Sequence, residues 1–410
     1  MSKLLHGLRV VDLTQFLSGP FCTQLLGGLG AEIIKVENPK GGASERNNTP
    51  FVGANGIDAI RHTDQDISMS VLKRSRNKKS ITLNLKHPKG RDLLFELIKS
   101  SDIIMENFRP GTMEKLGLSY EAVHAVNPRI IYCSLNGFGD IPGYEKTPAF
   151  DIIIQALSGA MSVNGYPDMP PVKANPAIAD LSAGLYSCIG ILAAVIGREK
   201  TGAGQKVCVS MMESMLSLLL DETVEYWVKT GMPLRNGSRL TRLTPFNIFE
   251  AKDGYFVVAS GTDAHWQNTL KAIGREDLSN DVRFTSSGAR ALNTYAVDDI
   301  INGWSKNISS SSAVATLTAF GIPCAEVKDI TDVINDKNLT SAGAIVPVMH
   351  PTLGEIDGVA SFCNPIRFSD SCAQFDQPAP LLGQDNKYVY QELLNLTDSS
   401  IAQLRCDGAI

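Results

Sequence analysis

The stretch LRVVDLTQFLSGPFCTQLLGGLGAEIIKVE, residues 8–37, decides the fold of this chain. Residues 8–12 are the apolar run of a buried strand, and a Ser-Gly-Pro turn follows at residues 18–20. A helical pattern then continues to Leu29 and ends at Gly30, before a second strand over residues 31–37. A strand, a helix and a strand in about 30 residues form the unit from which parallel sheets are built.

The same alternation continues along the chain. Strands are predicted over residues 80–85, 102–105 and 129–135, with a helix over residues 90–100 between the first two. A long buried helix is predicted over residues 180–198, and a strand followed by a helix over residues 207–217. This pattern predicts the α/β class, with a Rossmann-like, doubly wound parallel sheet.

The character of the sequence changes near Pro233. Residues 247–258 (NIFEAKDGYFVV) alternate in polarity around Asp253-Gly254, which predicts a β-hairpin. We therefore predict a large domain over residues 1–205 that is completed by residues 335–410. A linker helix is expected over residues 206–232 and a small α+β domain over residues 233–334. The last predicted helix covers residues 388–396.

Composition limits the class of protein. The 410 residues carry a net charge of −5, so nucleic-acid binding is not expected. The first residues lack the pattern of a signal peptide, and the apolar run at residues 189–196 is too short to span a bilayer, so no membrane partner is expected. The eight cysteines show no C-x-x-C pair and no zinc spacing, which indicates reduced thiols, a cytoplasmic protein and no metal site.

Familiar catalytic motifs are missing, but two polar segments suggest a ligand site. The sequence has no G-x-S-x-G, H-E-x-x-H, Walker or G-x-G-x-x-G motif. A basic cluster at residues 73–79 is either a solvated surface or a clamp for the phosphates of a nucleotide-like ligand. Residues 106–111 (ENFRPG) directly follow a predicted strand, where an open α/β sheet binds ligands, although an ordinary turn would also fit.

Two aspartates are placed at predicted helix starts. Asp151 follows PAF at residues 148–150, and Asp180 begins the long helix after Ala179. Each could simply cap its own helix. A carboxylate at a helix N-terminus is expected to keep a low pKa and stay ionised.

Taken together and in order, these segments resemble the class III coenzyme A transferases (CaiB/BaiF type), which include the formyl-CoA:oxalate and carnitine CoA-transferases. The resemblance extends over nearly the whole chain. The segments that carry it are LRVVDLTQFLSGP (8–20), GAEIIKVE (30–37), NKKSITLNL (77–85), ENFRPGTMEKLG (106–117), PAFDIIIQALSG (148–159), ADLSAG (179–184), REKTGAGQ (198–205) and APLLG (379–383).

The resemblance implies that Asp180 is the nucleophile. It would attack an acyl-CoA thioester to give a mixed anhydride, and the CoA thiolate would then form an aspartyl-CoA thioester. No general base is required, because each attacking group is already an anion, and backbone N–H groups would stabilise the oxyanion. Coenzyme A and acyl-CoA are then substrates, and no permanently bound cofactor is expected.

The resemblance also implies the residues that contact CoA and the acid. The matching CoA positions are Phe16, Leu83, Lys86, Asn107, Arg109 and Lys115. Asn38 stands where some members have a phosphate-binding arginine, and either Lys40 or the basic cluster Arg74–Lys79, which includes Arg76 and Lys78, is expected to replace that contact. The substrate positions are Leu17, Phe150 and Asp151.

Residues that depart from the family pattern bear on the substrate. Leu17 replaces a glutamine of the formyl-CoA enzyme, and Phe150 replaces a tyrosine of some oxalate-acting members. Residues 106–117 and 165–172 (GYPDMPPV) are most similar to the acetyl-CoA:oxalate branch, so the implied acceptor is a small acid such as oxalate, with acetyl-, formyl- or succinyl-CoA as donor.

Three alternatives stay open at this stage. An α-methylacyl-CoA racemase would share the fold, but it needs a histidine where this chain has Phe150. A NAD-dependent oxidoreductase would explain the first strand–helix–strand unit, but lacks its glycine fingerprint. The third is a noncatalytic CoA-binding protein. The family resemblance further implies a homodimer of interlocked chains.

Overall fold

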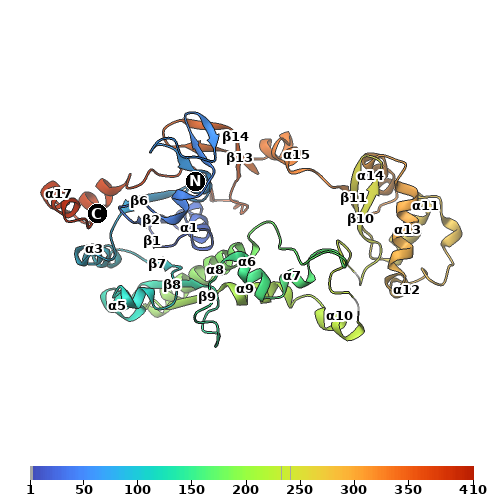
Figure 1. Cartoon of the computed structure of the whole chain (residues 1–410), viewed down its shortest axis with the longest axis horizontal. Coiled ribbons are helices and arrows are strands. Elements are labelled where there is room, and N and C mark those ends of the chain that lie inside the picture. The colour runs from blue at the N-terminus through green and yellow to red at the C-terminus, as the bar shows by residue number, and fades with distance from the viewer. Residues whose placement is uncertain (1–2, 232, 241) are drawn as a thin grey trace. The chain divides into compact units, whose positions relative to one another are not determined.

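The computed structural model describes residues 3–231, 233–240 and 242–410, and the chain divides into two compact units (Figure 1). The first, which we call the sheet unit, comprises the residues up to Ser158 together with Ala174–Glu222 and Lys337–Ile410. The second, the hairpin unit, comprises Gly159–Lys173 and Thr223–Asp336.

Six parallel strands form the centre of the sheet unit (Figure 1). Their order is β6-β2-β1-β7-β8-β9, so the direction of winding reverses between β1 and β7. This is the order of a doubly wound sheet, and the parallel α/β prediction is confirmed. The strands are β1 (Arg9–Asp12), β2 (Glu32–Glu37), β6 (Lys78–Thr82), β7 (Ile103–Glu106), β8 (Ile131–Asn136) and β9 (Lys206–Ser210).

Helices cover both faces of this sheet. On one face, α3 (Pro88–Lys99) and α5 (Tyr120–Val126) contribute to a core cluster that includes Val11 of β1 and Ile104 of β7. Val10 is also fully buried, and side chains alternate along a strand, so Val10 faces the opposite side. That side is covered by α1 (Ser18–Gly28) and α8 (Ile178–Thr201), which pack against each other and the sheet.

A glycine sets how closely α8 approaches α1. A Cβ atom added to Gly184 would lie 2.8 Å from the carbonyl oxygen of Ser18 and 2.9 Å from the Phe21 ring. A side chain at this position would therefore push the two helices apart. Because Asp180 lies one turn before Gly184, the same close crossing brings Asp180 to the first residue of α1.

Two small antiparallel sheets in the sheet unit were not predicted. One contains β3 (Phe51–Gly53), β4 (Gly56–Asp58) and β5 (Ile67–Ser68), and the other contains β13 (Ile345–His350) and β14 (Gly354–Phe362). They share a core with α2 (Met69–Arg74). The unit also contains η1 (Ser44–Asn47), α4 (Thr112–Lys115), α6 (Asp151–Leu157), α9 (Met211–Leu219) and α16 (Lys337–Ser341).

Two predictions about element boundaries are wrong. The last predicted helix, at residues 388–396, is a short π-helix, η3 (Tyr388–Leu393), and a further helix, α17 (Asp398–Cys406), follows it. The predicted linker at residues 206–232 does not exist as one element. Its first part forms β9, the last strand of the main sheet, which pairs with β8, and α9 follows directly, as the strand and helix predicted over residues 207–217 require.

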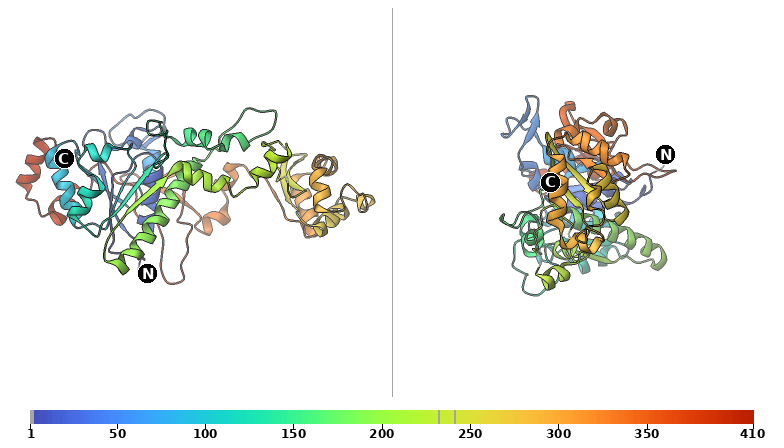
Figure 2. Two further views of the ribbon diagram at one scale, coloured as in Figure 1. Left: turned by 90° about the horizontal axis from the view of Figure 1, so that it is seen from below. Right: turned by 90° about the vertical axis from the view of Figure 1, so that its right-hand side faces the viewer.

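The hairpin unit contains the predicted hairpin, which is confirmed. Strands β10 (Phe246–Ala251) and β11 (Gly254–Ala259) pair antiparallel, and β12 (Cys324–Glu326) adds to β11. Helices pack on this small sheet around Trp266 and Phe256 (Figure 2). The remaining elements are α7 (Ala160–Val163), α10 (Val224–Thr230), α11 (Asp263–Ala272), η2 (Glu276–Leu278), α12 (Ser287–Leu292), α13 (Thr294–Ser305), α14 (Ser310–Ala319) and α15 (Ile330–Ile334).

The length of α8 corrects one expectation. The helix has 24 residues, and by length and composition alone it would be able to cross a membrane. The statement that the apolar run is too short is therefore wrong. However, 44% of its apolar window is buried against the rest of the unit, and core helices of globular proteins pass the same test. Buried Arg198 in its last turn also pairs with Asp102 at 3.1 Å.

Candidate active site

A cavity of about 300 Å³ lies at the carboxyl ends of β1, β7 and β8. This is the point where the strand order reverses, and open α/β sheets bind ligands there. Five of the site residues predicted from the sequence line it, together with Ser18. These lining residues are Phe16, Ser18, Asn107, Arg109, Phe150 and Asp180.

Asp180 is the third residue of α8 and is only partly exposed to solvent. Ser18, at the start of α1, lies beside its carboxylate, and the Ser18 hydroxyl and backbone N–H favour the ionised form. Burial, and after it the charge of Asp151, raises the pKa of Asp180 to about 6, although Ser18 and Arg74 act in the opposite direction. The expected low pKa is therefore wrong, because burial outweighs the helix N-terminus.

Asp151 caps a helix, but not its own. It is the first residue of α6, and its Oδ1 accepts from the backbone N–H of Ala179 at 2.8 Å and from that of Asp180 at 3.4 Å. Its Oδ2 accepts from Gln155 at 2.6 Å. Asp151 thus satisfies free N–H groups at the start of α8 and fixes the backbone that carries Asp180.

The turn after β1 holds Phe16 in a left-handed conformation with φ of 67°, which is unfavourable for a residue with a side chain. Its N–H donates to Glu45 Oε2 at 3.0 Å. Asn107 accepts from the N–H of Gln15 and donates to its carbonyl oxygen, each at 2.8 Å. The Phe16 ring lies edge-on to Phe150, 5.8 Å between centroids, so the two rings form one wall of the cavity.

Sequence reasoning missed Glu45, which is buried beneath this turn. Lys35 lies 3.5 Å from Glu45 and 3.6 Å from Asp12, so the turn rests on buried ion pairs. Although burial alone would raise it, the charges of Lys35 and Lys78 hold the pKa of Asp12 well below its usual value. The only sequence signal for Glu45 is its position shortly after a strand, which does not reveal the contact.

Lys78 belongs to these buried ion pairs and not to a phosphate site. Its ammonium donates to Asp12 Oδ2 at 3.0 Å, to the Pro20 carbonyl at 2.9 Å and to Thr23 Oγ1 at 2.8 Å. The side chain is fully buried, and all three ammonium protons have acceptors. The prediction that Lys78 binds CoA phosphates is therefore wrong.

Arg76 is also used for structure. Its Nη2 donates to Ser361 Oγ and to the Phe362 carbonyl, each at 3.0 Å. The guanidinium stacks on the rings of Phe362 and Phe375, at 5.3 and 4.6 Å from their centroids. Arg76 therefore joins the start of β6 to the C-terminal segment, and a phosphate-binding role does not fit this placement.

The other predicted CoA contacts follow the carboxyl ends of neighbouring strands. Asn38 comes after β2, Leu83 and Lys86 come after β6, and Lys115 ends α4, which follows β7. Asn38, Lys86 and Lys115 are exposed, whereas Leu83 is buried and donates its N–H to the Glu37 carbonyl at 2.7 Å. Leu17 directly precedes Ser18 at the start of α1.

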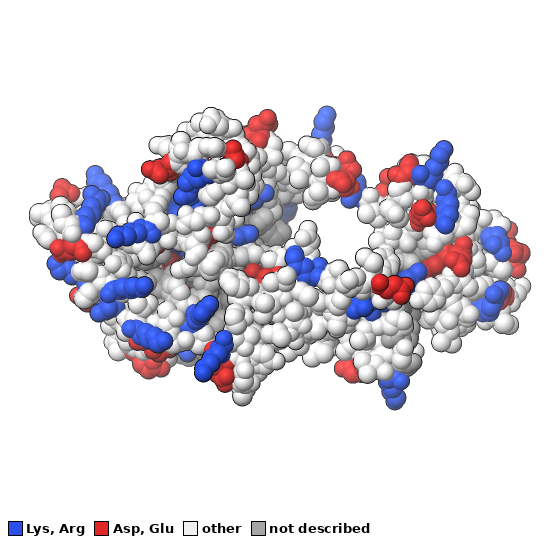
Figure 3. All heavy atoms as spheres, in the orientation of Figure 1, with Lys and Arg blue, Asp and Glu red and all other residues white. Residues whose placement is uncertain are grey.

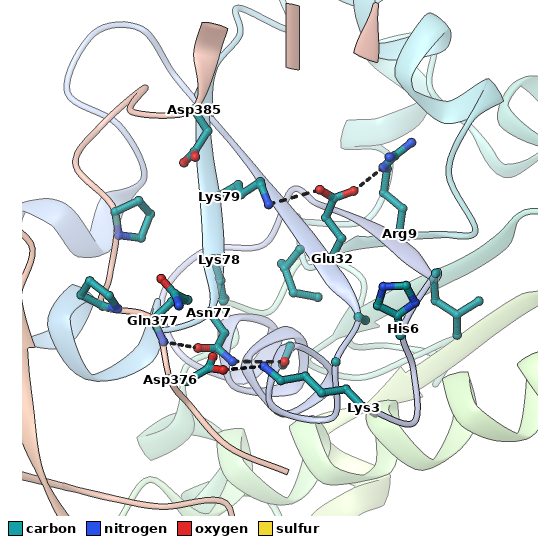
Figure 4. A pocket seen from close by; sticks show the side chains of 18 of the residues that line it. Lys3, His6, Arg9, Glu32, Asn77, Lys78, Lys79, Asp376, Gln377 and Asp385 are labelled. Carbon is teal, nitrogen blue, oxygen red and sulfur yellow. Dashed lines mark hydrogen bonds and ion pairs between the residues drawn. The ribbon is translucent and has the colours of Figure 1, made fainter. Parts of the chain in front are cut away.

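A second and larger cavity, about 590 Å³, lies at the opposite edge of the sheet (Figure 4). It is bordered by Arg9, Glu32 and Lys79 at or near the amino ends of β1, β2 and β6. Glu32 pairs with Arg9 at 2.7 Å and with Lys79 at 3.3 Å, while Lys3 pairs with Asp376 at 2.9 Å. These charges neutralise one another. Open α/β sheets bind their ligands at the carboxyl ends of the strands, whereas this cavity is at the amino ends, so we place the active site at the smaller cavity.

Two further features bear on cofactors. In the parts of the chain that the structure describes, no group of three or more His, Cys, Asp or Glu side chains is arranged to hold a metal ion. No disulfide bond joins the cysteines of the described residues.

Comparison with known proteins identifies the family. A model of CoA-transferase family III matches residues 5–386. The succinyl-CoA:mesaconate CoA-transferase of Haloarcula hispanica is 35% identical over 393 residues, which cover 95% of this chain and 96% of that protein. The formyl-CoA:oxalate CoA-transferase of Streptomyces avermitilis is 32% identical over 426 residues and is covered completely, as is this chain.

The fold agrees with this similarity. The crystal structure of a CaiB/BaiF family protein from Brucella suis superimposes with a TM-score of 0.81 at 32% identity, covering 96% of this chain and all of that one. The chain therefore belongs to CoA-transferase family III, and it is a CoA-transferase whose substrates are CoA thioesters.

Proposed function

We propose that this enzyme moves coenzyme A from an acyl-CoA donor to a small dicarboxylic acid, with Asp180 as the covalent nucleophile. The observation that carries the proposal is the position of Asp180. Its carboxylate borders the cavity at the switch point of the sheet, beside Ser18 at the N-terminus of α1.

The proposed reaction has two symmetrical halves. A carboxylate oxygen of Asp180 attacks the thioester carbonyl carbon, the C–S bond breaks, and CoA leaves as a thiolate, giving a mixed anhydride. The thiolate then attacks the aspartyl carbonyl carbon and releases the donor acid, leaving an aspartyl-CoA thioester. The acceptor carboxylate repeats these steps in reverse, which regenerates Asp180 and yields the new acyl-CoA. Four easier acyl transfers, two in each half, thus replace one difficult transfer.

The raised pKa of Asp180 suits this role. A carboxylate with a pKa of about 6 is more basic than an ordinary aspartate, yet is mainly ionised at neutral pH. Nucleophilicity increases with basicity, so burial improves the attacking group without requiring a separate base.

The choice of a dicarboxylic acid rests on the relatives. They are named for transfer between succinyl-CoA and mesaconate, D-citramalate or glutarate, or between formyl-CoA and oxalate. Each of these acceptor acids carries two carboxyl groups. Oxalate stays within the proposed class, together with somewhat longer acids.

Trapping the intermediate tests the mechanism. The enzyme is incubated with an acyl-CoA donor and hydroxylamine, and its peptides are examined by mass spectrometry. Asp180 is expected to become a hydroxamate only when donor is present, whereas the exposed Asp92 stays unmodified in the same sample. Donor-dependent modification at another residue, or none during active turnover, would contradict the proposal.

A racemase reaction is disfavoured by the same cavity. Phe150 lines it beside Phe16, where a racemase would need a proton carrier. We expect no exchange of α-hydrogen for deuterium in 2-methylacyl-CoA incubated with the enzyme in heavy water.

We also propose a homodimer. Several apolar side chains of α8 are exposed, among them Leu185, Ile189 (61% exposed) and Ile196 (62% exposed). Figure 3 shows few charged side chains over α8 and α9. Several exposed apolar side chains on one helix are typical of an interface between chains. Light scattering should give twice the chain mass, and Ile189→Glu should lower it; a monomeric wild type would contradict the proposal.

We further propose a cytoplasmic location, which is supported by the scattered spacing of the eight cysteines in a chain of this length. Cell fractionation of the tagged protein would test it.

A further inference from the structure

Arg74 is the last residue of α2, and the structure places it beside the active-site turn. Its Nη1 donates to the carbonyl oxygen of Phe16 at 3.4 Å. Phe16 forms a wall of the cavity, and Ser18, two residues later, lies beside the carboxylate of Asp180. Arg74 therefore lies over the segment that positions the nucleophile, and its charge acts on Asp180.

The charge of Arg74 is not used within the described structure. No ion pair joins it to a carboxylate of residues 3–231, 233–240 or 242–410, and the single bond to Phe16 is long. Besides Asp180, the charge of Glu45 acts on Arg74, and the Glu45 carboxylate already accepts from Phe16 and faces Lys35. Arg74 does not itself line the cavity, but its guanidinium contacts the backbone of Phe16, which does, and it has further N–H donors next to this turn.

Three of the four other cations of the basic segment make a clear contrast. Arg76 and Lys78 are bonded in the interior, and Lys79 pairs with Glu32 at the opposite edge of the sheet. Arg74 alone among these four lies next to the active-site turn without a carboxylate partner. A partly buried guanidinium without a counter-ion is unfavourable, and an anionic ligand would remove this cost.

We propose that Arg74 binds the free carboxylate of a dicarboxylic substrate while the other carboxylate reacts at Asp180. This inference rests on the proposed covalent role of Asp180. When one carboxyl group of the acid becomes an anhydride or a thioester, the other stays an anion and needs a cation near the cavity. The planar guanidinium of arginine can bind a carboxylate through two parallel hydrogen bonds. A monocarboxylic acid has no group to fill this position.

Acceptor selectivity tests the assignment. The values of kcat/KM are measured for succinate, glutarate and mesaconate, and for acetate and propionate, with one fixed acyl-CoA donor. Arg74→Met should lower kcat/KM for the dicarboxylates by roughly 100-fold and change it for the monocarboxylates by no more than about threefold. Arg74→Lys should restore part of the loss. Lys79→Met removes the same charge at the opposite edge and should change neither class of acid.

The outcomes separate this inference from the proposed function. Equal losses for mono- and dicarboxylates would show that Arg74 only supports the turn, and a raised KM for every acyl-CoA donor would show that it contacts CoA; either result overturns the inference. If Asp180 is never trapped in the wild type, the proposed function fails independently of Arg74. Thermal unfolding of each variant shows whether a loss of rate reflects a loss of fold.

Discussion

The six-stranded sheet borders one cavity at the amino ends of its strands, which we call the amino edge, and another at their carboxyl ends, the carboxyl edge. The larger cavity is at the amino edge, opposite Asp180. At the amino edge, Glu32 lies between Arg9 and Lys79, so the charges satisfy one another. At the carboxyl edge, Asp180 has a raised pKa and Arg74 has no carboxylate partner in the described residues. In this sheet, the charged side chains without a partner of opposite charge indicate the active site, whereas the size of the cavity does not.

The largest expected effect compares these edges directly. Asp180→Asn should lower kcat at least about 1,000-fold, because an amide cannot form the covalent intermediates. Glu32→Gln, an isosteric change at the amino edge, should leave kcat/KM within about twofold and lower stability by about 1 kcal/mol or less. Steady-state kinetics and thermal unfolding check both. A large kinetic loss for Glu32→Gln alone would show that the chemistry takes place at the amino ends of the strands, which would contradict our assignment of the active site.

The next effect tests how the carboxyl edge is assembled. A methyl group at Gly184 would meet the Ser18 carbonyl at 2.8 Å, so Gly184→Ala should displace α8 from α1. We expect a loss of about 1–3 kcal/mol in stability and of at least tenfold in kcat. Gly190→Ala is a partial control on the same helix, because its new methyl group would meet only the Val207 side chain, at 2.8 Å. Equal kinetic losses in the two variants would show that Asp180 does not depend on the crossing at Gly184.

A smaller effect concerns the turn that carries Phe16. Glu45→Gln keeps the size of the side chain but removes the charge that faces Lys35 and accepts from the Phe16 N–H. The left-handed backbone should become less populated, which raises KM for acyl-CoA a few-fold and changes kcat less. Stopped-flow binding of CoA would show the change directly. An unaltered KM would mean that the turn is held without Glu45.

The smallest effect is a shift in pH dependence. Because Asp180 must be ionised to attack, kcat/KM should fall as the pH decreases through about 6. Asp151→Asn keeps an oxygen that can accept from the Ala179 N–H but removes the neighbouring negative charge. The pKa of Asp180 should then be lower, so the acidic limb of the profile should move to lower pH. A profile that stays in place would assign this limb to another group.

Much of the fold could be read from the sequence because its signals are local. Residues 8–37 predict a strand, a helix and a strand, and the structure has β1, α1 and β2 there. The small sheets formed by β3–β5 and β13–β14 were missed, since short strands pair through contacts that no local pattern records. The sequence also predicted a helix up to residue 396 where η3 ends at Leu393, and it did not predict α17.

The sequence by itself determined the parallel α/β architecture, the family and the position of Asp180, because apolar periodicity and ordered motifs are written along the chain. Tertiary structure decided how the charges are used. In the sequence, Lys78 and Arg76 resemble a clamp for phosphates. In the folded chain, Lys78 is buried beside Asp12 and Arg76 stacks on Phe375, so neither is available for that role. The pKa of Asp180 likewise depends on burial and on Asp151, 29 residues away, and such surroundings exist only once distant segments have packed together.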